Sequence, residues 1–272
     1  MLRLALRVRR DQAELVLAEL LELAPAGVEE TAPSDDVVEY AVYGAPGELP
    51  ALPALKAVAG RALVEVATSE VPDDWHTRWR EFHRPLVLKG RLTVRPPWEP
   101  PGETPLDLVI DPGPAFGTGA HATTRLCLEL LLELEPREGG LVDLGCGSGV
   151  LAIAAARLGY APVLALDNDS AAVRATRENA RVNGIELEAR RHDLRREPAV
   201  VAPTVAANLL APLLETWAGR LALAPRRPER LIAGGLLCHE VDAIAPAFAA
   251  AGLHERARRG LGDWAAVLLV AG

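Results

Sequence analysis

The chain has 272 residues, which is enough for one large domain or for a large domain with a smaller one. Half of the residues are apolar and 24% are charged, as in ordinary globular proteins, and no apolar run approaches the roughly 20 residues that span a bilayer. The formal net charge of −8 argues against a general attraction to nucleic acid, and the three cysteines lack the CxxC spacing of a zinc site. This cysteine spacing predicts no bound metal. The N-terminal residues alternate charged with apolar side chains, unlike a signal peptide, so we predict a cytoplasmic protein.

The first 69 residues are predicted to form a small α+β domain. In chain order we expect a strand at 2–8, a helix at 13–23, strands at 27–28 and 37–43, a helix at 50–59 and a strand at 61–68. The order β-α-β-β-α-β is that of a ferredoxin-like domain. The segment holds 6 basic and 11 acidic residues, a balance that suits a basic protein partner better than a phosphate backbone.

Residues 70–105 are predicted to connect this domain to the rest of the chain. Trp75, Trp79 and Phe82 share one face of a predicted helix, and such a stripe usually packs against a core rather than binding a ligand. The segment 95–102 is rich in proline, so we expect an irregular stretch between short strands.

From residue 106 to residue 272, predicted strands alternate with predicted helices. The strands fall at 141–144, 162–166, 187–190, 204–207 and 230–233, and the helices at 123–134, 150–158, 170–183, 212–223 and 240–250. This alternation predicts an α/β fold with a doubly wound parallel sheet. The last two strands, at 254–259 and 265–270, are joined by a short turn and must pair antiparallel. A sheet that ends in an antiparallel hairpin differs from the usual dinucleotide-binding fold and is typical of the seven-stranded methyltransferase sheet.

A glycine-rich loop lies between the predicted strand at 141–144 and the predicted helix at 150–158. Its sequence is Asp143-Leu144-Gly145-Cys146-Gly147-Ser148-Gly149, and such glycines let the backbone approach a ligand at the carboxyl end of a strand. Gly147 or Gly149 would also suit a simple tight turn. Because position 150 is valine, the third glycine of the GxGxxG dinucleotide fingerprint is absent.

Asp167 ends the next predicted strand, 22 positions after Gly145. A carboxylate at that place can accept hydrogen bonds from both hydroxyl groups of a ribose. The alternative role for Asp167 is to cap the following helix, but Asp169 or Ser170 suits that role better. The glycine loop and Asp167 together therefore predict a site for a nucleoside-containing cofactor.

Two further segments are expected near the same sheet edge. Residues 111–124, which include the run Phe116-Gly117-Thr118-Gly119, form a loop of glycine, proline and small side chains that leads into the helix at 123–134. His121 is the one histidine in this loop, and a lone histidine more often has a structural role than a ligand-binding one. Asn208 ends the fourth strand of the alternating series, where its amide can either satisfy loop backbone or accept a hydrogen bond from an incoming amine.

Together, the segment 111–124, the loop 143–149, Asp167 and the run Asn208-Leu209-Leu210-Ala211 resemble the ribosomal protein L11 methyltransferases of the PrmA type. The resemblance runs from about residue 73 to the C-terminus and implies that the cofactor is S-adenosylmethionine. By matching position, the predicted cofactor contacts are Thr124, Gly145, Gly147, Asp167 and Asn208, joined by Phe116, Gly117, Thr118 and Gly119. Asn168 departs from the family pattern, in which a β-branched apolar residue is more usual between the two acids.

The resemblance also implies the reaction: methyl transfer to lysine side chains and to the N-terminal amine of ribosomal protein L11, free or on the ribosome. The small N-terminal domain fits the family's substrate-recognition domain in predicted topology. A free lysine has a pKa of about 10.4, so the site must favour the neutral amine, and desolvation beside a cationic sulfonium would do so. We predict that Asn208 is the catalytic residue and that it orients this amine.

Other functions stay open at this point. The nearest is a protein-lysine methyltransferase that acts on another protein, such as an electron-transfer flavoprotein. A nucleic-acid methyltransferase would use a basic cleft or an aromatic residue beside a flipped base, and the run 208–211 has no aromatic residue. Val150 and the C-terminal hairpin argue against a nicotinamide-dependent dehydrogenase, whereas a non-catalytic binding module would carry the same motifs. Trp264 begins the last strand, where we expect it to pack rather than to face a methylated ammonium.

Overall fold

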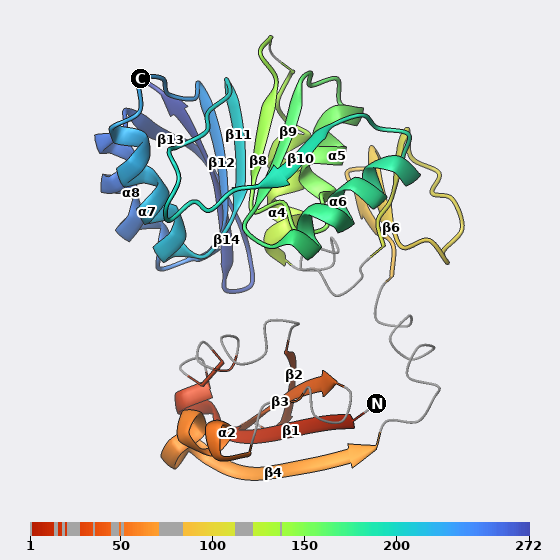
Figure 1. Cartoon of the computed structure of the whole chain (residues 1–272), viewed down its shortest axis with the longest axis vertical. Helices are drawn as coiled ribbons and strands as arrows, with labels where there is room; N and C mark the ends of the chain where they lie inside the picture. Colours follow the sequence, from red (N-terminus) through yellow and green to blue (C-terminus); the bar gives the residue numbers. More distant parts are fainter. Residues whose placement is uncertain are drawn as a thin grey trace. The chain divides into compact units, whose positions relative to one another are not determined.

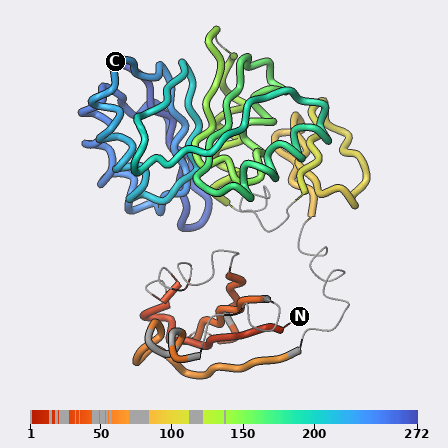
Figure 2. The backbone as a smooth tube through the Cα atoms, in the orientation of Figure 1, coloured from red at the N-terminus to blue at the C-terminus, as the bar shows by residue number. Residues whose placement is uncertain are grey.

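The computed structural model describes residues 2–13, 16, 17, 20, 28–34, 36–44, 49, 52–70, 84–111, 122–136 and 138–272. These residues belong to two compact units, Met1–Phe82 and His83–Gly272 (Figures 1 and 2). Each unit has its own sheet and its own apolar core. The predicted glycine run at 116–119, His121 and the aromatic stripe of Trp75, Trp79 and Phe82 lie outside the described residues.

The smaller unit is built on a four-stranded antiparallel sheet in the order β2-β3-β1-β4. Its strands are β1 (Leu2–Arg9), β2 (Glu29–Ser34), β3 (Val37–Gly44) and β4 (Leu63–Glu70), accompanied by helix α2 (Leu52–Ala59) and the 3-10 turns η1 (Arg10–Gln12) and η2 (Gly60–Ala62). Because successive side chains point to opposite faces of a strand, β1 buries Leu4, Leu6 and Val8 in one core.

Charged pairs lie on the second face of this sheet. The carboxylate of Glu39 on β3 accepts hydrogen bonds from Arg3 at 2.6 Å and from Arg7 at 2.7 Å, and these guanidinium groups lower the pKa of Glu39. Arg7 also pairs with Glu65 on β4 at 2.7 Å. Opposite charges on neighbouring strands support the observed register of the sheet.

Strand β2 departs from the sequence prediction. The strand expected at 27–28 starts instead at Glu29. Its sequence, EETAPS, lacks apolar alternation because β2 lies at the edge of the sheet. A proline such as Pro33 is tolerated there, since its missing N–H group can face away from the neighbouring strand.

The larger unit contains a seven-stranded mixed sheet in the order β10-β9-β8-β11-β12-β14-β13. The strands are β8 (Leu141–Leu144), β9 (Val163–Asp167), β10 (Glu188–Arg191), β11 (Thr204–Asn208), β12 (Arg230–Leu237), β13 (Leu253–Leu261) and β14 (Trp264–Ala271). Strands β8 to β12 pair in parallel, whereas β14 runs antiparallel to both β12 and β13. The predicted α/β fold is therefore confirmed, and the sheet ends in a hairpin.

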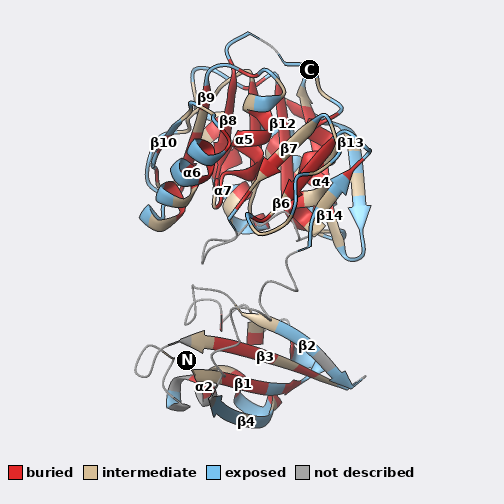
Figure 3. Ribbon diagram, turned by 90° about the vertical axis from the view of Figure 1, so that its right-hand side faces the viewer, coloured by how far each residue is buried: buried red, intermediate tan, exposed pale blue. Residues whose placement is uncertain are grey.

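Helices cover both faces of this sheet (Figures 1 and 3). They are α4 (Ala122–Leu131), α5 (Val150–Arg157), α6 (Ser170–Val182), α7 (Ala211–Ala222) and α8 (Val241–Ala250). One core combines α4, α5 and α6 with Ala206 of β11, and the other combines α7 and α8 with its neighbours Val205 and Ala207. Adjacent residues of one buried strand thus serve opposite faces, which explains why the strand is apolar throughout.

Three short strands precede the main sheet and belong to the larger unit. They are β5 (Leu86–Leu88), β6 (Leu92–Arg95) and β7 (Leu106–Val109), and they form a separate sheet in the order β5-β6-β7. Leu88, Leu92 and Leu108 are almost completely buried in the core that contains α4 and α5. Part of the predicted connector at 70–105 is therefore packed into the larger unit rather than linking two bodies.

Trp264 packs, partly buried, against that same core, as expected. Among the described helices, none combines the length and the apolar character that crossing a membrane requires.

Candidate functional site

The candidate site lies where the strand order of the main sheet reverses. From β8 the chain proceeds to β9 and β10 on one side of the sheet, whereas β11 and β12 lie on the other side. In open α/β sheets, this reversal leaves a crevice at the carboxyl ends of the strands, and ligands bind there. The glycine loop after β8 and Asn208 at the end of β11 therefore meet at this point.

The glycine loop adopts a backbone that only glycine takes up easily. Gly145, Gly147 and Gly149 have φ angles of 71°, 53° and 82°, in the left-handed region. A Cβ atom on Gly145 would also lie 2.3 Å from Cδ2 of Leu209, in the run that follows β11. Gly145 therefore allows a backbone conformation that L side chains rarely adopt, and its missing Cβ lets the Leu209 side chain pack against the loop.

The carboxylate of Asp167 is held against this loop. Its Oδ2 accepts a hydrogen bond from the Gly147 N–H at 3.0 Å, and its Oδ1 accepts one from the Asp169 N–H at 3.0 Å. Each oxygen keeps a second lone pair, so the carboxylate can accept two more hydrogen bonds. Helix α6 is capped by Asp169, whose Oδ1 accepts the Ala171 N–H at 2.8 Å, which leaves Asp167 free of the capping role.

Asp143 supports the loop from inside the protein. Its side chain is buried, and its Oδ2 accepts a hydrogen bond from the Ala152 N–H at 3.1 Å. Burial raises the pKa of Asp143 to about 7; the Ala152 hydrogen bond opposes this change, and the negative charge of Asp167 adds to it. A substantial fraction of Asp143 is therefore uncharged near neutral pH.

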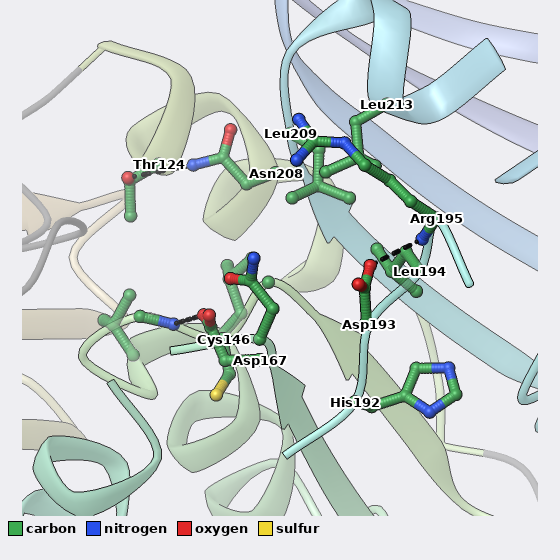
Figure 4. A pocket seen from close by; sticks show the side chains of 15 residues that line it. Thr124, Cys146, Asp167, His192, Asp193, Leu194, Arg195, Asn208, Leu209 and Leu213 are labelled. Carbon is green, nitrogen blue, oxygen red and sulfur yellow. Dashed lines mark hydrogen bonds between the residues drawn. The ribbon is translucent and has the colours of Figure 1, made fainter. Parts of the chain in front are cut away.

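Asn208 and Thr124 point toward one another across the site (Figure 4). The Asn208 Nδ2 donates a hydrogen bond to Thr124 Oγ1 at 3.2 Å, which joins the end of β11 to the first turn of α4. The Asn208 Oδ1 is buried and has no hydrogen-bond partner among the described residues. An unpaired buried carbonyl oxygen costs about 1–3 kcal/mol, so this atom would gain from an incoming N–H donor.

These groups line one pocket with a volume of about 220 Å³ (Figure 4). The structure brings together five of the predicted site residues, namely Thr124, Gly145, Gly147, Asp167 and Asn208. The other four, Phe116, Gly117, Thr118 and Gly119, lie outside the described residues. The pocket is lined further by Cys146, Val150, Leu151, Asn168, His192, Asp193, Leu194, Arg195, Leu209 and Leu213.

The run 192–195 is the part of this lining that the sequence analysis missed. It follows β10, and its turn is closed by two hydrogen bonds: Arg195 N–H to Asp193 Oδ1 at 2.9 Å, and Asp193 N–H to Glu197 Oε1 at 2.8 Å. A signal was available, because 192–195 follows the third parallel strand just as Asp167 and Asn208 end the second and the fourth. In such a sheet, the residues that follow the carboxyl end of any parallel strand are candidates for lining the ligand pocket.

Comparisons with known proteins agree with this site. The family model described as ribosomal protein L11 methyltransferase (PrmA) matches residues 48–271. The ribosomal protein L11 methyltransferase of Symbiobacterium thermophilum is 38% identical over 198 residues, which cover 72% of this chain and 65% of the relative. The corresponding protein of Heliobacterium modesticaldum is 37% identical over 200 residues, which cover 72% of this chain and 63% of the relative. The matched region thus spans slightly less than two thirds of these relatives' own length.

A solved structure gives the same result at the level of the fold. The crystal structure of the ribosomal protein L11 methylase from Lactobacillus delbrueckii subsp. bulgaricus superposes with a TM-score of 0.62 at 26% sequence identity, covering 70% of this chain and 99% of that one. The family model includes every predicted site residue from Phe116 to Asn208. The resemblance drawn from the motifs is confirmed, and the chain belongs to the ribosomal protein L11 methyltransferase (PrmA) family.

Proposed function

We propose that this protein is an S-adenosylmethionine-dependent methyltransferase that modifies lysine side chains and the N-terminal amine of ribosomal protein L11. The observation that carries the proposal is the buried, unpaired Oδ1 of Asn208, a residue that lines the same pocket as the glycine loop and Asp167. One part of the pocket suits a nucleoside, and another offers an acceptor for an amine N–H group. Family membership supports the same activity.

The residues of the pocket fit this cofactor. Asp167 keeps acceptor capacity for a ribose, and Gly145 and Gly147 of the glycine loop line the same pocket. Thr124, Gly145, Gly147, Asp167 and Asn208 would hold the cofactor, together with Phe116, Gly117, Thr118 and Gly119. When bound, S-adenosylmethionine supplies an electrophilic methyl group on a cationic sulfonium.

Asn208 would orient the acceptor amine. A neutral amine has one lone pair for the reaction, and its N–H groups are donors that an amide oxygen can accept. The bond from Asn208 Nδ2 to Thr124 fixes the amide so that Oδ1 remains available. Once the amine is neutral and aligned, positioning supplies much of the rate, so a strong general base is unnecessary.

The smaller unit would recognise the protein substrate. Its strand order, with helix α2 between β3 and β4, supports a ferredoxin-like domain at 1–69. The seven-stranded methyltransferase domain proposed for 106–272 is extended by β5 and β6, which pack into its core, so only the part of 70–105 before residue 83 is proposed as a linker. The excess of acidic over basic residues in 1–69 suits a basic ribosomal protein. We expect a cytoplasmic enzyme that makes no sequence-specific contact with nucleic acid.

The test is to incubate the protein with S-adenosylmethionine labelled in its methyl group and, in parallel reactions, with purified L11, with L11 on ribosomes or with an electron-transfer flavoprotein, and to map the label by mass spectrometry. Label on lysine and N-terminal amines of L11 is the expected result. Label on an electron-transfer flavoprotein, with none on L11, would support the alternative substrate and refute the proposal.

Asn208→Ala tests the orienting role. We expect kcat to fall about 100-fold, because the amine loses its alignment. Affinity for S-adenosylhomocysteine, measured by calorimetry, should fall far less. Asn208→Asp retains an acceptor oxygen and should keep more activity than Asn208→Ala. Equal losses of turnover and of cofactor affinity in Asn208→Ala would contradict the orienting role.

A further inference from the structure

One face of helix α6 carries a buried polar stripe that the pocket itself does not include. The stripe consists of Thr176, Asn179 and the C-cap residue Asn183, spaced by three and four residues, and their exposed fractions are 0%, 3% and 5%. Three and four residues separate neighbours on one helix face. Buried polar side chains are retained where they make specific hydrogen bonds, so the partners of this stripe show what it holds.

Two asparagines of the stripe bind the backbone of β7 and the residues after it. Asn183 Nδ2 donates to the Val109 carbonyl at 2.7 Å, and Asn183 Oδ1 accepts the Val109 N–H at 2.9 Å. Asn179 Oδ1 accepts the Asp111 N–H at 2.9 Å, and its Nδ2 lies 3.4 Å from the Asp111 carbonyl.

The spacing of the two asparagines matches the spacing of their partners. Four residues of a helix advance about 6 Å, and two residues of a strand advance about 6.6 Å. Between the two bound residues, Ile110 turns to the opposite side, where its N–H donates to Arg95 in β6 at 2.9 Å. The side chains of Asn179 and Asn183 therefore make, with the backbone of Val109 and Asp111, hydrogen bonds of the kind that a neighbouring strand would make.

Asn179 differs from Asn183 in one respect: it also holds the glycine loop. Its Nδ2 donates to the Ser148 carbonyl at 2.9 Å, inside the loop 143–149. One turn earlier, Thr176 Oγ1 donates to the Gly147 carbonyl at 3.0 Å. By contrast, the remaining side-chain bond of Asn183 goes to the Asn179 carbonyl within α6, at 2.8 Å.

We propose that Asn179 is a positioning residue for the cofactor, because it ties the segment that begins at Asp111 to the glycine loop at Ser148. This inference rests on the proposed function and adds a residue that touches neither cofactor nor substrate. A single amide bridges two segments that are 37 positions apart in the sequence, and both lead to predicted cofactor contacts. Without it, the loop keeps its glycines and its bond to Asp167 but loses this side-chain bridge between Ser148 and Asp111.

The chain supplies a matched control. Asn179→Ala and Asn183→Ala each remove a buried amide and its hydrogen bonds from the same helix face, so both should lower the thermal midpoint. Of the two variants, only Asn179→Ala removes the amide that bridges Ser148 and Asp111. We expect S-adenosylhomocysteine to bind at least about tenfold more weakly to Asn179→Ala and within about threefold of wild type to Asn183→Ala.

Each variant is titrated with S-adenosylhomocysteine in a calorimeter, and its thermal midpoint of unfolding is measured. The two measurements together distinguish a loss of cofactor positioning from a general loss of stability. Equal losses of affinity in the two variants would overturn the inference. If Asn179→Ala does not fold, Asn179→Asp and Asn183→Asp replace the pair: Asn179→Asp keeps the acceptor for the Asp111 N–H and loses the donor to Ser148, so it should still bind more weakly than Asn183→Asp. Wild-type protein that fails to bind S-adenosylhomocysteine would refute the proposed cofactor instead.

Discussion

The buried carboxyl of Asp143 makes the stability of the protein depend on pH in a predictable direction. Burial raises the pKa of Asp143 to about 7, from an ordinary value of 3.8. Because the folded pKa lies above the unfolded one, stability is fully present below about pH 4 and is lost as the pH rises toward 7. The difference between the two values corresponds to at most about 4 kcal/mol.

Asp143→Asn removes this loss, since the amide stays neutral and its oxygen can still accept the Ala152 N–H. The free energy of unfolding of the variant, relative to wild type, should increase by about 2–3 kcal/mol between pH 5 and pH 8. Urea denaturation of the cofactor-free proteins, followed by tryptophan fluorescence at pH 5, 6, 7 and 8, measures this difference. Groups that do not interact with Asp143 titrate alike in both proteins, so their effects cancel.

Two results would refute the reasoning about Asp143. A difference between variant and wild type that does not change with pH would mean that the carboxyl ionises at its ordinary pKa. A difference that moves in favour of wild type as the pH rises would mean that the ionised carboxylate stabilises the fold.

Two further substitutions test the loop and the core. Gly145→Ala should weaken S-adenosylhomocysteine binding about tenfold or more, because the new Cβ atom would lie 2.3 Å from Leu209 at a φ of 71°. The control Gly262→Ala, with a φ of 58° and nothing within 4 Å, should leave binding unchanged; equal effects on affinity would contradict the argument. Trp217→Ala should lower the free energy of unfolding by about 3–5 kcal/mol, since Trp217 is fully buried and packs on Phe248 with ring centroids 6.5 Å apart. A loss in urea denaturation below about 1 kcal/mol would show that the core around α7 and α8 closes over the gap.

Much of the larger unit follows from local sequence patterns. Apolar runs with helices between them predicted β8, β9 and β11 within one residue, because strand and helix periods are local properties. Strand β10, predicted at 187–190, lies at Glu188–Arg191 although its sequence is mostly charged. Three of the residues predicted for the site, Gly145, Asp167 and Asn208, meet in one pocket because each belongs to a loop or strand end at the carboxyl edge of the same sheet.

Tertiary structure decided the features that depend on burial and on distant partners. The placement of β5 and β6 in the larger unit depends on which core covers Leu88 and Leu92, which no local pattern specifies. Strand β2 was predicted at 27–28 but runs from Glu29 to Ser34, because an edge strand needs no apolar alternation to mark its position.

The site shows the same division. Its residue types and their spacing could be predicted from the sequence, since glycine, aspartate and asparagine are recognisable where they follow a predicted strand. Three other features could not be predicted, because each arises from atoms that only folding brings together: the raised pKa of Asp143, the unpaired Oδ1 of Asn208 and the bridge through Asn179. The sequence by itself thus determined which groups carry the chemistry, and the tertiary structure decided their charge, their free hydrogen-bonding capacity and what holds them in place.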